Sequence, residues 1–148
     1  MYVDADYANK DNDRRSVSGV ALMVGGTAVN ASSTTQHCVT LSTSEAEYVA
    51  MAQGAKTALF TKAVLDFMQP GIVRETIDMF EDNQGAIAIA ENPISGGRTM
   101  HIDVRHHFIR ELVKRKVLSV QFTESSSQHA DILTKPLGLE AFVKHVRF

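Results

Sequence analysis

The sequence has 148 residues, the size of one ordinary domain, and we expect a single domain over 1–148. Its 44% hydrophobic and 22% charged residues are typical of a globular protein and exclude a disordered or fibrous chain. No apolar run approaches the ~20 residues that cross a bilayer, no signal peptide is visible, and a single cysteine, Cys38, excludes an internal disulfide. We therefore expect neither a membrane partner nor export.

The first part of the chain predicts three strands. Residues 2–6 and 17–24 are rich in apolar and branched side chains, which favours strands. Gly25 and Gly26 suit a two-residue hairpin turn, because glycine accepts positive φ at little cost, and 27–32 would return antiparallel. These strands should form an antiparallel meander.

The rest of the chain predicts helices and two more strands. Ser42 and Glu45 have the spacing of a capping box, at the start of a long helix that continues without proline over 46–68. The later elements are a strand over 75–81, a short helix over 82–91, a helix after Met100, a strand over 117–123, and a helical region from 130 onward with an interruption at Pro136. This order predicts an α/β domain with a mixed sheet.

Positive charge is concentrated in one segment. The chain has a formal net charge of -2, yet 98–116 contains six basic and two acidic residues, a net charge of +4. A basic stretch on an acidic body suits a protein that binds a polyanion on one side. A solvated helix face explains the same charges equally well.

Four acidic residues lie where structural acids are uncommon. They occur on the first strand, in the long helix, where a strand meets a helix, and in the last helical region: Asp4, Glu47, Asp82 and Asp131. Acidic side chains are rarely buried unless they are paired or bind a metal. Four such carboxylates can hold two Mg²⁺ ions ~4 Å apart, which position an attacking water and stabilise the leaving oxygen of a phosphodiester.

Each of these acids also has a purely structural explanation. Asp82 and Asp131 could be helix N-caps, a role that aspartate fills well. Glu47 could form a second capping box with Ser44. Asp4 could lie on an exposed edge strand. The four positions together, rather than any one of them, favour a metal site.

Five collinear stretches carry a more specific signal. They are YVDADYA at 2–8, LSTSEAEY at 41–48, EDNQ at 81–84, RTMHIDVRHHFIRE at 98–111 and ADILTKP at 130–136. In order and spacing they resemble the ribonuclease H domain of Ty1/copia-type retrotransposon polyproteins, over nearly the whole chain. The resemblance implies a ribonuclease H-like fold, a five-stranded mixed sheet with helices on both faces.

The resemblance also implies an activity and a set of site residues. The family hydrolyses the RNA strand of RNA–DNA hybrids as a metal-dependent endonuclease with two Mg²⁺ ions, for which Mn²⁺ can substitute. Its D-E-D-D set of catalytic, metal-binding acids corresponds to Asp4, Glu47, Asp82 and Asp131. Asp4 would bridge both ions. Glu47 and Asp82 would hold the ion nearer the leaving group, and Asp131 the ion that activates water. We assign Glu47 because Glu45 fits the helix cap better.

The family relationship further implies partners and a location. Besides an RNA–DNA hybrid, we expect the reverse transcriptase or polymerase domain of a parent polyprotein as a partner. The cytoplasm is the expected location, with the nucleus as the alternative.

Substrate contacts are expected next to the acids and on the basic segment. A hybrid duplex is close to A-form, and its wide minor groove displays 2′-hydroxyls. Asn83 and Gln84, directly after Asp82, are candidates for reading those hydroxyls. The candidates for salt-dependent phosphate contacts are Arg98, Arg105, Arg110 and Lys114.

The chain departs from the family pattern at several positions. Residues 30–35 are polar where the family has tryptophan and basic residues, and Met100 stands where lysine is common. Because both changes remove nucleic-acid contacts, the alternative function is a weak or inactive ribonuclease H-fold module, derived from a mobile element, that binds nucleic acid or protein. His129 lies only two residues before Asp131, and we do not assign it the product-release role of the family's histidine.

Overall fold

A computed structural model describes residues 1–8, 13–71, 76–92 and 100–147, and describes side chains in these ranges except at 100–106. The strands are β1 (Tyr2–Asp6), β2 (Val17–Val24), β3 (Thr27–Thr35), β4 (Ile77–Glu81) and β5 (Leu118–Phe122). The helices are α1 (Thr43–Met68), α2 (Gln84–Glu91), α3 (Met100–Lys114) and α4 (Leu139–Val146), with short 3-10 turns η1 (Ser125–Ser127) and η2 (His129–Leu133). None of the described helices is both long and apolar enough to cross a bilayer.

The strands form one mixed sheet in the order β3-β2-β1-β4-β5. The first three pair antiparallel as a meander, whereas β4 pairs in parallel with both β1 and β5. The predicted five-stranded mixed sheet is therefore confirmed. β1 lies at its centre, and Asp4 is paired with Gly19 of β2. This central place rules out the exposed edge strand as an explanation for Asp4.

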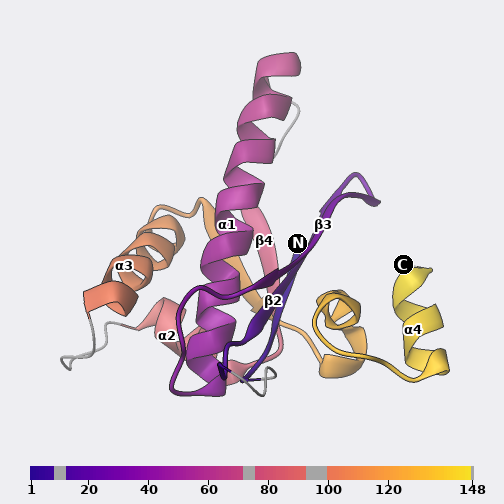
Figure 1. The fold of residues 1–148 in the computed structure, drawn as a ribbon. Coiled ribbons are helices and arrows are strands. Elements are labelled where there is room, and N and C mark those ends of the chain that lie inside the picture. The colour runs from indigo at the N-terminus through magenta and orange to yellow at the C-terminus, as the bar shows by residue number, and fades with distance from the viewer. Residues whose placement is uncertain (9–12, 72–75, 93–99, 148) are drawn as a thin grey trace.

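The two faces of the sheet are covered differently (Figure 1). α1 crosses one face against β1 and β2, with α2 and α3 beside it against β4 and β5. η2 lies against β1, β2 and β3, and α4 packs on η2. Because neighbouring residues of a strand point to opposite faces, Val3 faces α1 whereas Asp4 faces the η2 side. Val3 therefore joins the core under α1, whereas the Asp4 carboxylate can meet the segment around η2.

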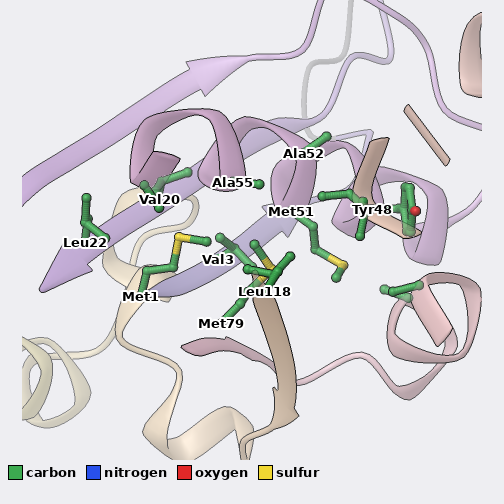
Figure 2. Packing of buried hydrophobic residues seen from close by; sticks show 14 residues of the cluster. Met1, Val3, Val20, Leu22, Tyr48, Met51, Ala52, Ala55, Met79 and Leu118 are labelled. Atoms are coloured by element: carbon green, nitrogen blue, oxygen red, sulfur yellow. The ribbon is translucent and has the colours of Figure 1, made fainter. Parts of the chain in front are cut away.

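The hydrophobic core lies between the sheet and α1 (Figure 2). Fully buried side chains from four elements meet there: Val3, Val20, Met51 and Met79. Alanines occupy much of the α1 face that meets them, such as Ala52 and Ala55. Small side chains let the helix approach the sheet closely, which holds the first turns of α1 against the end of β1.

The main differences from the sequence prediction are in β3 and in the C-terminal region. β3 continues to Thr35 instead of ending at 32, because its polar residues pair with β2 along a largely exposed edge of the sheet. The region after 130 is not one interrupted α-helix: η2 ends at Leu133, and α4 begins only at Leu139. Side chains of this region hydrogen-bond to the sheet, as described below, and these bonds replace regular helical pairing.

Candidate active site

Three carboxylates from distant parts of the chain converge at the end of the sheet where β1 and β4 terminate. Asp4 on β1, Glu47 on α1 and Asp82 directly after β4 each offer an oxygen within 4.8 Å of the other two. They line a cavity of about 430 Å³ together with Ser125 and Lys135. β1 and β4 are parallel neighbours, so their carboxyl ends reach the same edge of the sheet and bring Asp4 and Asp82 together.

The first two glutamates of α1, Glu45 and Glu47, have different roles. The Ser42 hydroxyl accepts a hydrogen bond from the Glu45 backbone N–H at 3.2 Å, and Glu45 Oε2 accepts one from the Leu41 N–H at 2.7 Å. Glu45 is therefore used at the exposed helix start, as predicted. Glu47, half a turn later, is only 4% exposed and faces the cavity.

Asp82 is not a helix cap. Asn83 caps α2, since its Oδ1 accepts hydrogen bonds from the Ala86 N–H at 3.0 Å and from the Ser44 hydroxyl at 3.1 Å. The Asp82 carboxylate instead faces the cavity, where its Oδ2 accepts a 2.6 Å hydrogen bond from the Ser125 hydroxyl. The capping explanation for Asp82 was wrong, because its neighbour fills that role.

Two of the three converging acids, Asp4 and Glu47, hold protons unusually tightly. Burial, opposed in part by the Thr134 hydroxyl, raises the pKa of Asp4 to about 6. Burial and the nearby charge of Glu81 raise the pKa of Glu47 to about 11. Bringing several carboxylates together out of water is costly unless a cation or a proton neutralises them.

Glu81 is a fifth acid that the sequence reading did not single out. It is fully buried, and burial raises its pKa well above the usual range. Its Oε1 accepts a hydrogen bond from the Asn83 N–H at 3.0 Å, while its Oε2 has no hydrogen-bond partner among the described residues. The alternation that points Ile77 and Met79 inward continues to 81, so the period of two already contained this signal.

The acids fit a divalent cation. Carboxylate oxygens are the ligands that Mg²⁺ and Mn²⁺ prefer in proteins. Glu47 Oε2 is buried without a hydrogen-bond partner in the described part of the chain, so it has a free acceptor beside Asp4 and Asp82. A doubly charged ion bound to these three carboxylates would remove the repulsion that burial imposes on them.

Asp131 lies beside the cluster but is engaged elsewhere. It is 7% exposed, within η2, and its Oδ1 is 2.9 Å from the Lys135 ammonium. It is not one of the three acids whose oxygens converge. Nor is it an N-cap, because Gln128 caps η2 by accepting from the Ala130 N–H. The structure therefore brings together three of the four predicted acids and places an ion pair at the fourth.

Residues 125–135, which we call the clamp segment, hold the acids in place. Besides the Ser125 bond to Asp82, the Thr134 hydroxyl donates to Asp4 Oδ2, and the Gln128 side chain donates to the Val3 carbonyl at 2.8 Å. The close approach needs Gly19 on β2, since a Cβ there would lie 2.7 Å from Thr134 Cγ2.

The predicted nucleic-acid contacts are only partly described. Asn83 lines the cavity and Gln84 is exposed next to it. Arg110 is half-buried near Tyr48 and Lys114 is exposed on α3, and neither lines the cavity. Arg98 and the Arg105 side chain lie outside the described residues.

His129 packs away from the acids. Its Nδ1 is 3.1 Å from Nδ1 of His145 on α4, and the Tyr2 ring meets it edge-on. Burial and the nearby charge of His145 lower the pKa of His129 to about 4. The histidine thus joins α4 to the sheet and does not line the acidic cavity.

A larger cavity of about 640 Å³ opens at the other end of the sheet. Its lining is mainly apolar, with Leu22, Leu65 and Phe80, and the three converging acids are not part of it. The converging acids therefore belong to the smaller cavity.

Sequence relatives cover nearly the whole chain. No protein-family model matches it. The retrovirus-related Pol polyprotein from transposon TNT 1-94 of Nicotiana tabacum is 37% identical over 141 residues, which is 95% of this chain. The corresponding polyproteins from transposons RE1 and RE2 of Arabidopsis thaliana are each 33% identical, again over 95% of it. The chain spans only 10% of the length of each of these curated relatives.

Solved structures share the fold at low sequence identity. LC11-RNase H1, determined in complex with an RNA/DNA hybrid, superimposes with a TM-score of 0.61 at 14% identity, over 90% of this chain and 91% of that one. The N-terminal RNase H domain of a Mycobacterium tuberculosis protein gives 0.62 at 13% identity, over 98% and 94%. RNase H1 from Halobacterium salinarum gives 0.59 at 20% identity, over 97% and 96%. The chain is thus a homologue of one segment of the Pol polyproteins of plant copia-type transposons, and it has the ribonuclease H fold.

Proposed function

We propose that this domain is a metal-dependent ribonuclease H, which hydrolyses the RNA strand of RNA–DNA hybrids. The observation that carries the proposal is the convergence of Asp4, Glu47 and Asp82 within 4.8 Å in an open, acidic cavity. LC11-RNase H1, which shares the fold, was determined with an RNA/DNA hybrid, and this supports the same substrate class here.

Asp4, Glu47 and Asp82 would hold a divalent cation, Mg²⁺ or in its place Mn²⁺, and Asp131 would contribute to a second ion. Such ions supply an activated water and stabilise the leaving oxygen of a phosphodiester. The residues of the chain do the positioning: Ser125 and Thr134 hold the carboxylates of Asp82 and Asp4 by hydrogen bonds. Fixed ligands lose little freedom when a cation binds, which favours binding.

Recognition of the hybrid would involve two surfaces. Asn83 and Gln84 lie next to Asp82, where polar groups can meet the ribose hydroxyls that distinguish RNA from DNA. The basic residues of the α3 region, Arg98, Arg105, Arg110 and Lys114, would contact phosphates. Such contacts weaken as salt rises and carry no sequence preference.

A second candidate function is a module that binds hybrid without cleaving it efficiently. The Asp131–Lys135 ion pair favours this alternative, because it occupies an acid that the two-ion mechanism needs. A reverse transcriptase or polymerase domain would be the partner in either case, since the relatives are Pol polyproteins.

A cleavage assay tests the proposal. A duplex with labelled RNA and unlabelled DNA is incubated with Mg²⁺ or Mn²⁺ and with wild type, Asp82→Asn or Asp66→Asn. Asp66 is an acid of the distal part of α1 that pairs with Lys62 outside the cavity, so its variant is a matched control. We expect cleavage by wild type and by Asp66→Asn, and a loss of at least about 100-fold in Asp82→Asn. Binding without cleavage by wild type would favour the second function, and equal cleavage by all three proteins would contradict the assigned site.

A further inference from the structure

Lys135 places a positive charge inside the candidate active site. Its ammonium is 2.9 Å from Asp131 Oδ1, and its side chain lines the same cavity as Asp4, Glu47 and Asp82. The negative charges of Asp4, Asp131 and Asp82 all act on it. The cavity therefore contains a cation that the protein itself supplies.

The lysine is brought there by the clamp segment. Thr134, the preceding residue, donates its hydroxyl to Asp4, and the Gln128 amide donates to the Val3 carbonyl. These bonds fix the position of the backbone next to Lys135. The lysine side chain itself remains 40% exposed, whereas that of Asp131 is 9% exposed, so the ammonium can leave toward solvent more easily than the carboxylate can.

The three acids that line the cavity and Asp131 beside it are unequally available to a metal ion. Asp4, Glu47 and Asp82 already converge, and Glu47 Oε2 has no hydrogen-bond partner within the described residues. Asp131 Oδ1 also makes no hydrogen bond of regular geometry with the described residues, but it differs from Glu47 Oε2 in lying 2.9 Å from an ammonium, that of Lys135. Two cations in contact with one carboxylate oxygen repel each other strongly, so an ion that uses Asp131 must compete with this lysine.

We propose that the Lys135 ammonium occupies the position of the second metal ion, so that the domain binds one divalent cation readily and a second one only when Lys135 releases Asp131. The inference rests on the proposed function, because it takes Asp4, Glu47 and Asp82 as the ligands of the first ion. It makes Lys135 a positioning residue that controls how much divalent metal the enzyme needs.

Metal binding measured without substrate tests this directly. Mn²⁺ is titrated into the protein and followed by electron paramagnetic resonance and calorimetry, for wild type, Lys135→Gln and Lys135→Arg. We expect one stronger and one weaker Mn²⁺ in wild type. Lys135→Gln should bind the second ion at least about tenfold more tightly, whereas Lys135→Arg, which keeps the charge, should bind it as weakly as wild type does.

The chain offers a matched control. Lys62 forms an ion pair with Asp66, also at 2.9 Å and also four residues apart, outside the cavity. Lys62→Gln should leave both Mn²⁺ affinities unchanged. Asp131→Asn combined with Lys135→Gln should lose the tightened second site, which identifies Asp131 as the ligand that the lysine had occupied.

The outcomes separate this inference from the proposed function. If the first Mn²⁺ binds and Asp82→Asn removes it, but Lys135→Gln leaves the second affinity unchanged or weaker, the role of Lys135 is overturned and the metal site remains. Such a result, with a higher KM for hybrid in Lys135→Gln, would assign the lysine to phosphate contact instead. If wild type binds no Mn²⁺, both proposals are wrong.

Discussion

The Thr134 hydroxyl donates a hydrogen bond to the carboxylate of Asp4, and so joins the central strand to a residue 130 positions later in the chain. The bond is buried, and it partly offsets the effect of burial on the pKa of Asp4. A single side chain of the clamp segment thereby adjusts both the position and the ionisation of a candidate metal ligand.

Replacing Thr134 by valine should weaken metal binding near neutral pH. The change removes the donor, so the pKa of Asp4 rises further above about 6 and the metal must displace a more tightly held proton. We expect Mn²⁺ affinity to reach its plateau at higher pH than in wild type, and stability to fall by about 1–3 kcal/mol. Thr134→Ser keeps the hydroxyl and should retain the wild-type pH profile. A valine variant with an unchanged profile would show that this bond does not control Asp4.

Glu47→Gln should stabilise the metal-free protein while weakening its response to metal. The folded protein raises the pKa of Glu47 to about 11, so it holds this proton more tightly than the unfolded chain does. Stability is then greatest below the ordinary glutamate pKa and falls as pH rises through neutral. Glutamine cannot ionise, and we expect a gain of about 1–3 kcal/mol at pH 7.5, measured by urea unfolding with chelator present.

The response to metal is the second half of that measurement. Mg²⁺ should raise the Tm of wild type more than that of Glu47→Gln, because the variant keeps only the Asp4 and Asp82 carboxylates as ligands. Glu45→Gln is the control: this glutamate accepts the Leu41 N–H at the helix start, so its loss should cost about 0.5 kcal/mol and leave the Mg²⁺ response intact. A Glu47→Gln protein that is less stable than wild type without metal would contradict the electrostatic argument.

Gly19→Ala should disturb the site by pushing the clamp segment away from β2. The added Cβ would lie 2.7 Å from Thr134 Cγ2 and 2.9 Å from the Ala130 carbonyl oxygen, so the segment must move away from β2. We expect a loss of about 1–3 kcal/mol and reduced cleavage. Gly138→Ala is the control for close approach, because a Cβ there meets no atom within 4 Å. Since Gly138 is the N-cap of α4, where alanine is disfavoured, the variant should lose up to about 1 kcal/mol but keep its cleavage activity. Similar behaviour of the two variants in a thermal melt and in the cleavage assay would refute the close-approach argument.

His129 should make the protein less stable in mild acid. The pKa of His129 is lowered to about 4 in the folded protein. Between this value and the ordinary histidine pKa, the ring is protonated in the unfolded chain but stays neutral in the folded protein. Stability is therefore lost as pH falls below about 6.5. Because the ring is partly exposed, we expect an effect on the order of 1 kcal/mol, or about 3 °C in Tm, between pH 7.5 and 5.

The raised pKa values of Asp4 and Glu47 make the folded protein more stable as the pH falls, which opposes the effect of His129. The effect of His129 must therefore be measured as a difference between variants. His129→Gln should remove the acid-induced decrease relative to wild type, whereas His37→Gln, at an exposed position, should not. Parallel stability curves for wild type and His129→Gln from pH 7.5 to 5 would show that burial of this ring is not coupled to folding.

Several features of the site could be predicted because they depend on neighbours in sequence. The capping pattern at Ser42 assigned Glu45 to the helix start, as the hydrogen bonds confirm. Glu47, the remaining candidate, lines the acidic cavity. Alternation in β4 points Met79 inward, and the same period leads to Glu81, a signal that was present but not followed. The sequence left open whether Asp82 caps α2, because aspartate and asparagine cap equally well and only the structure shows that Asn83 is the cap.

The amino-acid sequence by itself determined the strands and the long helix, since periodicity, capping and turn chemistry act over a few residues. The ribonuclease H kinship came instead from the resemblance of five collinear stretches to that family. Tertiary structure decided which polar groups meet: Thr134 with Asp4, Ser125 with Asp82, and Lys135 with Asp131. These contacts depend on how closely β2 and the clamp segment approach each other. They also depend on which side chains become buried and lose contact with water. Such distances arise only when the whole chain is folded, so no local pattern encodes them.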